Sequence, residues 1–311
     1  MMRKMAFTET FKIEAVAPFN FDLTAQIFQS GDKQIRTYAN GQFTQVLKLN
    51  GKLTIVKLAS TGTIELPKIT VELKSNNLIT LQDKQKAEEV VKFIFNLDFD
   101  LGSFYSEVKN DCTMTQIAQQ LYGLKNPTTP TVFEALVDSI VEQQISIKVA
   151  HALEERLVKK FGEALTLNGE TYYAYPTPQN IASVSIEEIW NCGLSQRKAE
   201  YIQHSAELIV NGKLDLEHLK THQNPEEIIL ELDAIRGIGV WTAELTMLRG
   251  MQKLDALPAD DLGVRRVISR YFCSGKPIKS AEAREIAKSW GRWKGLAAYY
   301  LIVAEVKDIT F

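Results

Sequence analysis

Two adjacent carboxylates, Asp260 and Asp261, follow Pro258 in the string LPADDLGVRR. A carboxylate can stabilise positive charge that develops in a transition state, and it can act as a general base that orients an attacking water. Either aspartate can equally serve as the N-cap of a helix that begins after it. The pair by itself therefore leaves both carboxylate catalysis and helix capping open.

Upstream of the aspartates, two glycines stand one residue apart in the string IRGIGVWTAE. We expect a helix that ends near Asp233, a tight turn over residues 236–239, and a second helix that begins at Val240 or Trp241. The free N–H groups at the start of the second helix would suit a phosphate, and Ile238 would plug the turn into the core. An ordinary glycine-containing connection is the alternative, since short glycine motifs are weak evidence.

The composition is that of a globular protein with room for two or three domains: 311 residues, 45% hydrophobic and 24% charged. A net charge of −2 counts against a non-specific nucleic-acid binder but permits a local basic face. The N-terminal segment lacks the apolar core of a signal peptide, and no stretch approaches the ~20 apolar residues of a membrane span. We therefore expect a cytosolic or nuclear protein with no membrane partner.

The cysteines and histidines do not form a metal-binding pattern. Cys112, Cys192 and Cys273 contain no CxxC pair, which argues against a disulfide framework, a zinc site or an iron–sulfur cluster. The histidine pair His218 and His222 has helical spacing but lacks a third ligand, so we expect no metal at these side chains.

Residues 1–100 contain short β-branched and aromatic segments such as FTQVLKL, LTIVKLA and KITVEL. Turn residues separate them, most clearly Asn50-Gly51, which tolerate the positive φ of a type I′ turn. The pattern predicts antiparallel hairpins. Two helices should accompany the sheet, one near Leu23–Gln29 opened by Asp22 and one near Asp83–Phe95.

From about Asp111 onward, apolar residues recur at three- and four-residue spacing. We therefore predict the α+β class, with an α+β domain and its antiparallel sheet over residues 1–100. An all-helical region should follow over residues 101–311 and carry the hairpin at 232–244. This region should divide into two subdomains, the last of which combines residues 262–311 with 101–125.

The hairpin string and the aspartate string together resemble the helix-hairpin-helix DNA glycosylases, most closely the 3-methyladenine DNA glycosylase II family. The resemblance extends over nearly the whole chain, including PFNFD at 18–22, EQQIS at 142–146 and the tryptophans of 290–293. It implies that Asp261 is the catalytic carboxylate and that Asp260 is a neighbour or a cap.

The resemblance also implies an aromatic pocket for the excised base, made by Trp241, Phe19, Tyr299 and Tyr300. Ile302 stands where the family has a late aromatic residue, which puts the substrate range in doubt. Relatives that also nick the DNA backbone carry a Schiff-base lysine where this chain has Trp241, so a monofunctional, water-using enzyme is implied. Packing of Trp241 in the core is the alternative.

For DNA binding, the resemblance makes Gln144 the wedge that fills the vacated base stack. The full set of expected contacts is Gln143, Gln144, Ser146, Gly237, Ile238, Gly239, Thr242 and Arg265. For Arg265, a solvated helix face is the alternative. The partner would be double-stranded DNA with a damaged base, bound by a monomer without a cofactor. A monovalent cation held by backbone carbonyls of the hairpin is implied as well.

These observations favour a monofunctional glycosylase that removes alkylated purines of the 3-methyladenine and 7-methylguanine type during base excision repair. A glycosylase for mispairs or other damaged bases is the first alternative. A non-catalytic helix-hairpin-helix DNA-binding protein is the second, and the position of Asp261 argues against it.

Overall fold

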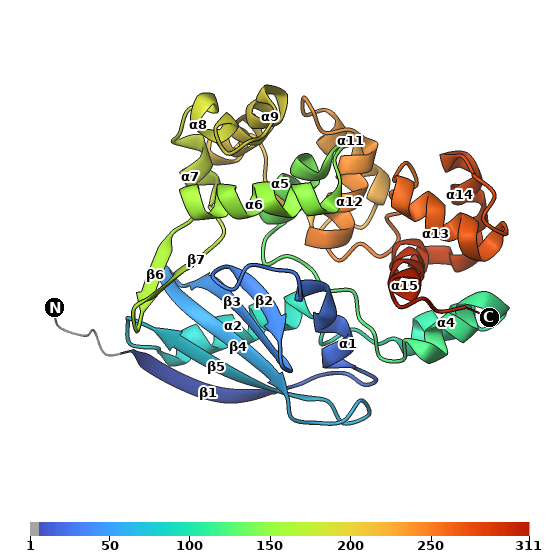
Figure 1. The fold of residues 1–311 in the computed structure, drawn as a ribbon, viewed down its shortest axis with the longest axis horizontal. Coiled ribbons are helices and arrows are strands. Elements are labelled where there is room, and N and C mark those ends of the chain that lie inside the picture. Colours follow the sequence, from blue (N-terminus) through green and yellow to red (C-terminus); the bar gives the residue numbers. More distant parts are fainter. Residues whose placement is uncertain (1–5, 311) are drawn as a thin grey trace.

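The computed structural model describes residues 6–310 and begins with a five-stranded antiparallel sheet of order β1-β5-β4-β3-β2 (Figure 1). The strands are β1 (Phe7–Glu14), β2 (Arg36–Ala39), β3 (Gln42–Leu49), β4 (Lys52–Ser60) and β5 (Lys68–Ser75). The turn between β3 and β4 has Asn50 at φ 46° and Gly51 at φ 80°, as a type I′ turn requires. The expected α+β class and its N-terminal antiparallel hairpins are confirmed.

Two helices accompany the sheet and share its core. Helix α2 (Leu81–Ile94) buries Ala87, Val91 and Ile94 against sheet side chains. Helix α1 (Phe21–Ala25) begins earlier than expected, because Asn20, and not Asp22, caps it and accepts a hydrogen bond from the N–H of Leu23 at 3.0 Å. The short 3-10 helix η1 (Gln26–Phe28) follows it.

The remainder of the described chain is mostly helical. Its helices are α3 (Gly102–Val108), α4 (Cys112–Gln120), α5 (Val132–Glu142), α6 (Ile147–Phe161), α7 (Pro178–Ala182), α8 (Ile186–Trp190), α9 (Gln196–Val210), α10 (Leu216–Leu219), α11 (Pro225–Asp233), α12 (Val240–Gly250), α13 (Leu262–Phe272), α14 (Ser280–Ala287), η2 (Lys288–Trp293) and α15 (Lys294–Val306). Among residues 6–310, no helix has the length and apolar character needed to cross a membrane.

The expectation of an all-helical region after residue 100 is wrong at one place. Strands β6 (Ala164–Leu167) and β7 (Glu170–Tyr173) form a hairpin that extends toward the sheet (Figure 1). Its turn is Asn168-Gly169, with φ 53° and 90°, the same turn chemistry that joins β3 to β4. Leu165 and Leu167 are buried because they pack with side chains of the large sheet.

Two hydrophobic clusters hold the helical region, and α12 belongs to both. One cluster combines α5, α6, α9, α11 and α12, and includes Met247. The other combines residues 101–124 with α13 to α15, and includes Leu248. Neighbouring residues of α12 therefore face different clusters. This helix and the segment after it connect the turn between α11 and α12 to the start of α13 (Figure 1).

Candidate active site

The turn between α11 and α12 contains two glycines with different structural roles. Gly237 has φ 92°, and a Cβ there would lie 2.2 Å from ring atoms of Tyr201. Gly239 has φ −92°, and a Cβ there would meet nothing within 4 Å. The fold therefore requires glycine at 237 but not at 239, where the missing side chain leaves the surface open to an approaching ligand.

The start of α12 is likewise open. Gly239 is the N-cap, so no side chain caps the first N–H groups of this helix. Ile238 is buried in the helical core beneath the turn. Backbone N–H groups, and not the Ile238 side chain, are thus what the hairpin can offer to a phosphate.

Asp261 caps α13 and also faces the hairpin. Its Oδ1 accepts hydrogen bonds from the N–H groups of Gly263 at 2.7 Å and Val264 at 3.0 Å. Its Oδ2 accepts a hydrogen bond from Trp241 Nε1–H at 3.2 Å. Capping and a chemical role are therefore not exclusive alternatives, because one oxygen holds the carboxylate in place while the other faces the indole.

The neighbouring carboxylate lies elsewhere. Asp260 is exposed, and its Oδ2 is 3.7 Å from Arg284 Nη2. Arg284 also makes a bidentate ion pair with the buried Glu244, with N–O distances of 2.7 and 3.0 Å. The sequence offered no signal for this pair, because its members come from α12 and α14. Arg284 therefore draws Asp260 toward α14 and leaves Asp261 as the carboxylate beside Trp241.

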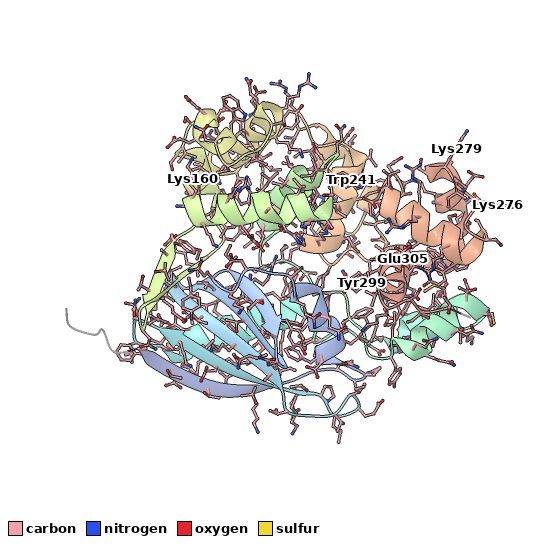
Figure 2. The ribbon with its side chains drawn as sticks, in the orientation of Figure 1. Lys160, Trp241, Lys276, Lys279, Tyr299 and Glu305 are labelled. Carbon is pink, nitrogen blue, oxygen red and sulfur yellow. The ribbon has the colours of Figure 1, made fainter. Side chains whose placement is uncertain are left out.

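Of the expected pocket residues, Trp241 is the one with a contact to Asp261, whereas Tyr299 lies in the core cluster of α13 to α15 (Figure 2). Trp241 is partly exposed and contacts Asp261. Tyr299 retains 8% of its surface, and burial raises the pKa of its hydroxyl, which stays protonated.

Phe19 and Tyr300 need correction, because both are core residues. Phe19 packs in the sheet domain with Lys125 Nζ 5.4 Å from its ring centroid. Tyr300 has no exposed surface, and its hydroxyl donates to the carbonyl of Leu124 at 2.7 Å. Adjacent residues on α15 point about 100° apart, so Tyr299 and Tyr300 cannot face the same space. Within the described structure, neither Phe19 nor Tyr300 contacts Trp241 or Asp261 through an aromatic contact or a hydrogen bond.

The loop between α5 and α6 lies against the hairpin. Gln144 is exposed with φ 58°, and Ser146 is the exposed N-cap of α6. Gln143 instead turns inward, and its Nε2 donates to Gly237 O at 2.9 Å and to Thr242 Oγ1 at 3.0 Å. The Thr242 side chain is buried, so a contact between Thr242 and DNA would have to use its backbone N–H at the start of α12.

The three arginines that follow Asp261 on α13 differ in their ion pairs. Arg266 forms a bidentate pair with Glu305, with Nη2–Oε2 at 2.7 Å, and Arg270 pairs with Asp308 at 2.9 Å. Arg265 is half-buried, and its buried Nε has no hydrogen-bond partner among the described residues. Unlike Arg266 and Arg270, Arg265 forms no ion pair with a described residue.

A cluster of largely buried charged side chains surrounds helix α5, which precedes the loop of Gln143 to Ser146. Helix α5 carries Glu134, Asp138 and Glu142 at four-residue spacing. Arg36 of β2 pairs with Glu134 at 2.7 Å, and Arg249 of α12 pairs with Glu142 at 2.6 Å. The surrounding groups include Glu154, whose Oε1 has no hydrogen-bond partner in residues 6–310 and whose pKa burial raises to about 9. These contacts join the sheet, α5 and α12.

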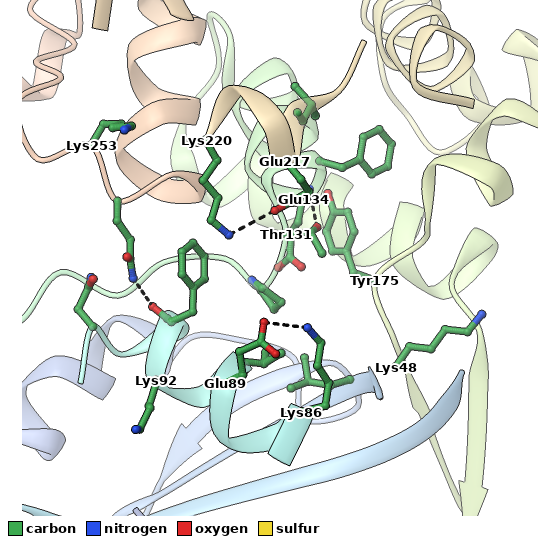
Figure 3. Close-up of a pocket in the computed structure, with 18 of the residues that line it drawn as sticks. Lys48, Lys86, Glu89, Lys92, Thr131, Glu134, Tyr175, Glu217, Lys220 and Lys253 are labelled. Atoms are coloured by element: carbon green, nitrogen blue, oxygen red, sulfur yellow. Dashed lines mark hydrogen bonds and ion pairs between the residues drawn. The ribbon is translucent and has the colours of Figure 1, made fainter. Parts of the chain in front are cut away.

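A large cavity of about 1510 Å³ lies between the sheet domain and the helices (Figure 3), and neither Asp261 nor Trp241 is part of its lining. Charged residues on its walls neutralise one another, as in the pairs Lys86–Glu89 at 2.9 Å and Lys220–Glu217 at 3.2 Å. The volume of this cavity does not make it the reaction site, because the chemistry-bearing carboxylate is not part of its lining.

Comparisons with known proteins identify the family. Residues 137–292 match the HhH-GPD superfamily of base excision DNA repair proteins. The chain is 33% identical to a DNA-3-methyladenine glycosylase of Bacillus subtilis over 222 residues, which cover 70% of this chain and 73% of the relative.

Solved structures share the whole fold. A 3-methyladenine DNA glycosylase from Archaeoglobus fulgidus superposes with a TM-score of 0.84 at 28% identity, over 95% of this chain and 98% of that one. An 8-oxoguanine glycosylase/lyase from Clostridium acetobutylicum has a TM-score of 0.76 at 21% identity, over 98% and 99% of the two chains, and shows a likeness of fold alone. The chain belongs to the HhH-GPD superfamily of base excision DNA repair proteins and, within it, to the alkylated-base branch of the DNA glycosylases.

Proposed function

We propose that the protein hydrolyses the N-glycosidic bond of alkylated purines of the 3-methyladenine and 7-methylguanine type in double-stranded DNA, and leaves the strand intact. The observation that carries this proposal is the Asp261 carboxylate, whose Oδ2 lies 3.2 Å from Trp241 Nε1 while Oδ1 is held by two backbone N–H groups. The names of the relatives from Bacillus subtilis and Archaeoglobus fulgidus support the same substrate class.

The chemistry follows from this pair. A base inside the duplex must first be flipped out of the stack. The C1′–N bond then breaks, its electron pair leaves with the cationic base, and the base departs neutral. Asp261 stabilises the cation left on the sugar, and water adds to C1′ and releases a proton. Trp241 offers its ring to an electron-poor base, and such a contact contributes about 0.5–2 kcal/mol.

DNA would be held at the hairpin. The uncapped N–H groups at the start of α12 suit a phosphate, and the open surface at Gly239 lets the DNA backbone approach. Gln144 and Arg265 would provide the wedge and a further phosphate contact. The carbonyls of Arg236 and Ile238 accept no hydrogen bond from a described residue, and they would hold a monovalent cation. We propose that the protein acts in this way as a monomer wherever the DNA of its cell lies, cytoplasm or nucleus.

Base release and strand integrity test the proposal. Purified protein is incubated with duplexes that carry methylated purines, hypoxanthine, 8-oxoguanine or uracil, and free bases are identified by chromatography. We expect methylated purines to be released fastest and strands to break only after alkali. Asp261→Asn is the inactive control. A covalent adduct trapped by borohydride, or 8-oxoguanine as the fastest substrate, would overturn the proposal. DNA binding without release of any base would instead support the non-catalytic alternative.

A further inference from the structure

The conformation of the loop between α5 and α6 requires support from outside the loop. Gln144 occupies the left-handed region at φ 58°, which residues with a Cβ seldom adopt. Gln144 itself is exposed and makes no hydrogen bond to the described chain. Such a backbone persists when surrounding contacts determine it. The residues before Gln144 provide those contacts.

Lys198 of α9 holds the first half of the loop. Its Nζ donates to the carbonyls of Val141 at 2.8 Å and Gln143 at 2.7 Å. These carbonyls stand at the C-terminal end of α5, where intrahelical donors run out and a cation is favourable. The ammonium therefore fixes the direction in which the chain leaves α5.

Gln143 then joins the loop to the hairpin. Both N–H bonds of its amide are used, one toward Gly237 O and one toward Thr242 Oγ1, so a single side chain spans the turn and the first turn of α12. One residue earlier, Glu142 pairs with Arg249 near the other end of α12 at 2.6 Å. Two consecutive loop-side residues are thus fastened to opposite ends of the hairpin's second helix.

Helix α9 completes the connection. Tyr201 lies three residues after Lys198, on the same side of the helix, and its ring contacts Gly237 so closely that no Cβ fits there. The contacts therefore form a ring: Lys198 of α9 binds Gln143, Gln143 binds Gly237, and Gly237 contacts Tyr201, which again belongs to α9. A displacement of the loop would therefore displace the hairpin as well.

We propose that Gln143 and Lys198 are positioning residues that fix Gln144 relative to the hairpin, so that probing of the duplex and anchoring of its phosphates occur as one rigid unit. The inference rests on the proposed function, in which Gln144 enters the DNA and the hairpin binds it. Neither positioning residue needs to touch the DNA.

A double-mutant cycle separates positioning from general stability. Affinity for a duplex with an abasic-site analogue is measured by fluorescence anisotropy, and base flipping by the fluorescence of 2-aminopurine beside a methylated purine. Gln143→Ala removes two hydrogen bonds, so we expect affinity and flipping to fall by roughly 5- to 100-fold. In a protein that already carries Gln144→Ala, Gln143→Ala should cause almost no further loss of affinity or flipping, because Gln143 acts through Gln144.

Lys198→Met is a second, independent variant. It removes both carbonyl contacts, and we expect the same loss of flipping and the same lack of additivity with Gln144→Ala. Gln119→Ala, on the exposed face of α4, is the matched control and should behave as the wild type. Thermal denaturation of each variant is recorded so that a variant that does not fold is replaced in the cycle by the other.

The outcomes distinguish the two proposals. If the wild type flips and releases methylated purines, but the losses from Gln143→Ala and Gln144→Ala multiply, the positioning role is wrong and the proposed function stands. Unchanged base flipping in both Gln143→Ala and Lys198→Met would likewise overturn the positioning role. If the wild type neither prefers the abasic duplex to undamaged DNA nor releases a base, the proposed function falls, and the positioning role falls with it.

Discussion

Replacing Asp261 by asparagine should abolish base release while leaving the fold intact. Asparagine is about as good an N-cap as aspartate. Its amide oxygen must take the place of Oδ1, because that position accepts from the N–H groups of Gly263 and Val264. The amide nitrogen then occupies the place of Oδ2 and faces the donor Trp241 Nε1. The variant therefore loses both the negative charge and the contact with the indole.

The size of the effect can be estimated from electrostatics. A carboxylate about 4 Å from a developing unit charge, at an effective dielectric constant of about 20, contributes roughly 4 kcal/mol. Loss of that contribution slows base release by roughly a thousandfold. The cost in stability should be only about 1 kcal/mol, since the two capping hydrogen bonds remain.

Single-turnover release of methylated purines, abasic-duplex affinity and thermal denaturation provide the three measurements. Asp260→Asn is the matched control and should retain the wild-type rate, because it loses only a solvent-exposed contact at 3.7 Å with Arg284. The reasoning is refuted if Asp261→Asn, folded and bound to DNA, releases base within about tenfold of the wild-type rate. It is also refuted if Asp260→Asn is the variant that loses activity.

Four further results are expected. Gly239→Val should keep the wild-type melting temperature, because a Cβ at 239 meets nothing within 4 Å, yet weaken anisotropy-measured affinity for all DNA sequences alike; unchanged affinity contradicts the phosphate anchor. Gly237→Ala should destabilise the fold by about 1–3 kcal/mol in thermal denaturation, because its Cβ would lie 2.2 Å from Tyr201, and an unaltered melting temperature would refute the close contact. Trp241→Leu should slow release of cationic methylated purines more than release of neutral hypoxanthine, and equal losses would argue against stacking on the charged base. Burial raises the pKa of Glu154 from 4.5 to about 9, so between pH 4.5 and pH 9 the folded protein retains a proton that the unfolded chain has lost. The free energy of unfolding therefore falls as the pH rises through this interval, by up to ~1.4 kcal/mol per pH unit. Urea denaturation of Glu154→Gln should therefore show a flatter pH dependence, and an unchanged slope would contradict the shift.

Local sequence patterns predicted the elements of this fold well where short-range chemistry decides them. Asn50-Gly51 indicated a hairpin because both residues accept positive φ, and three- to four-residue apolar spacing indicated the helices. Asn168-Gly169 carries the same signal, but it lies in the region that was expected to be all helical. Its strands are stabilised by Leu165 and Leu167, which pack on a sheet far away in sequence.

Side-chain direction at the candidate site was less predictable. Phe19, Tyr300 and Thr242 were expected to face the base or the DNA, yet all three are buried. A position in a motif does not specify which neighbour a side chain meets, and that depends on how the elements pack. The same applies to Lys198, whose carbonyl partners on α5 lie more than fifty residues away and left no sequence signal.

The sequence by itself determined the hairpin, the helix that begins after Asp261 and the family, because each depends on residue types at short, regular spacing. The tertiary structure decided which of the two carboxylates faces Trp241. Asp260 and Asp261 are chemically identical and adjacent, so the resemblance to the family, and no property of the two residues themselves, singled out Asp261 in the sequence. Arg284 approaches Asp260 from α14 while Trp241 Nε1 lies 3.2 Å from Asp261 Oδ2, and only packing of α12, α13 and α14 brings those groups together.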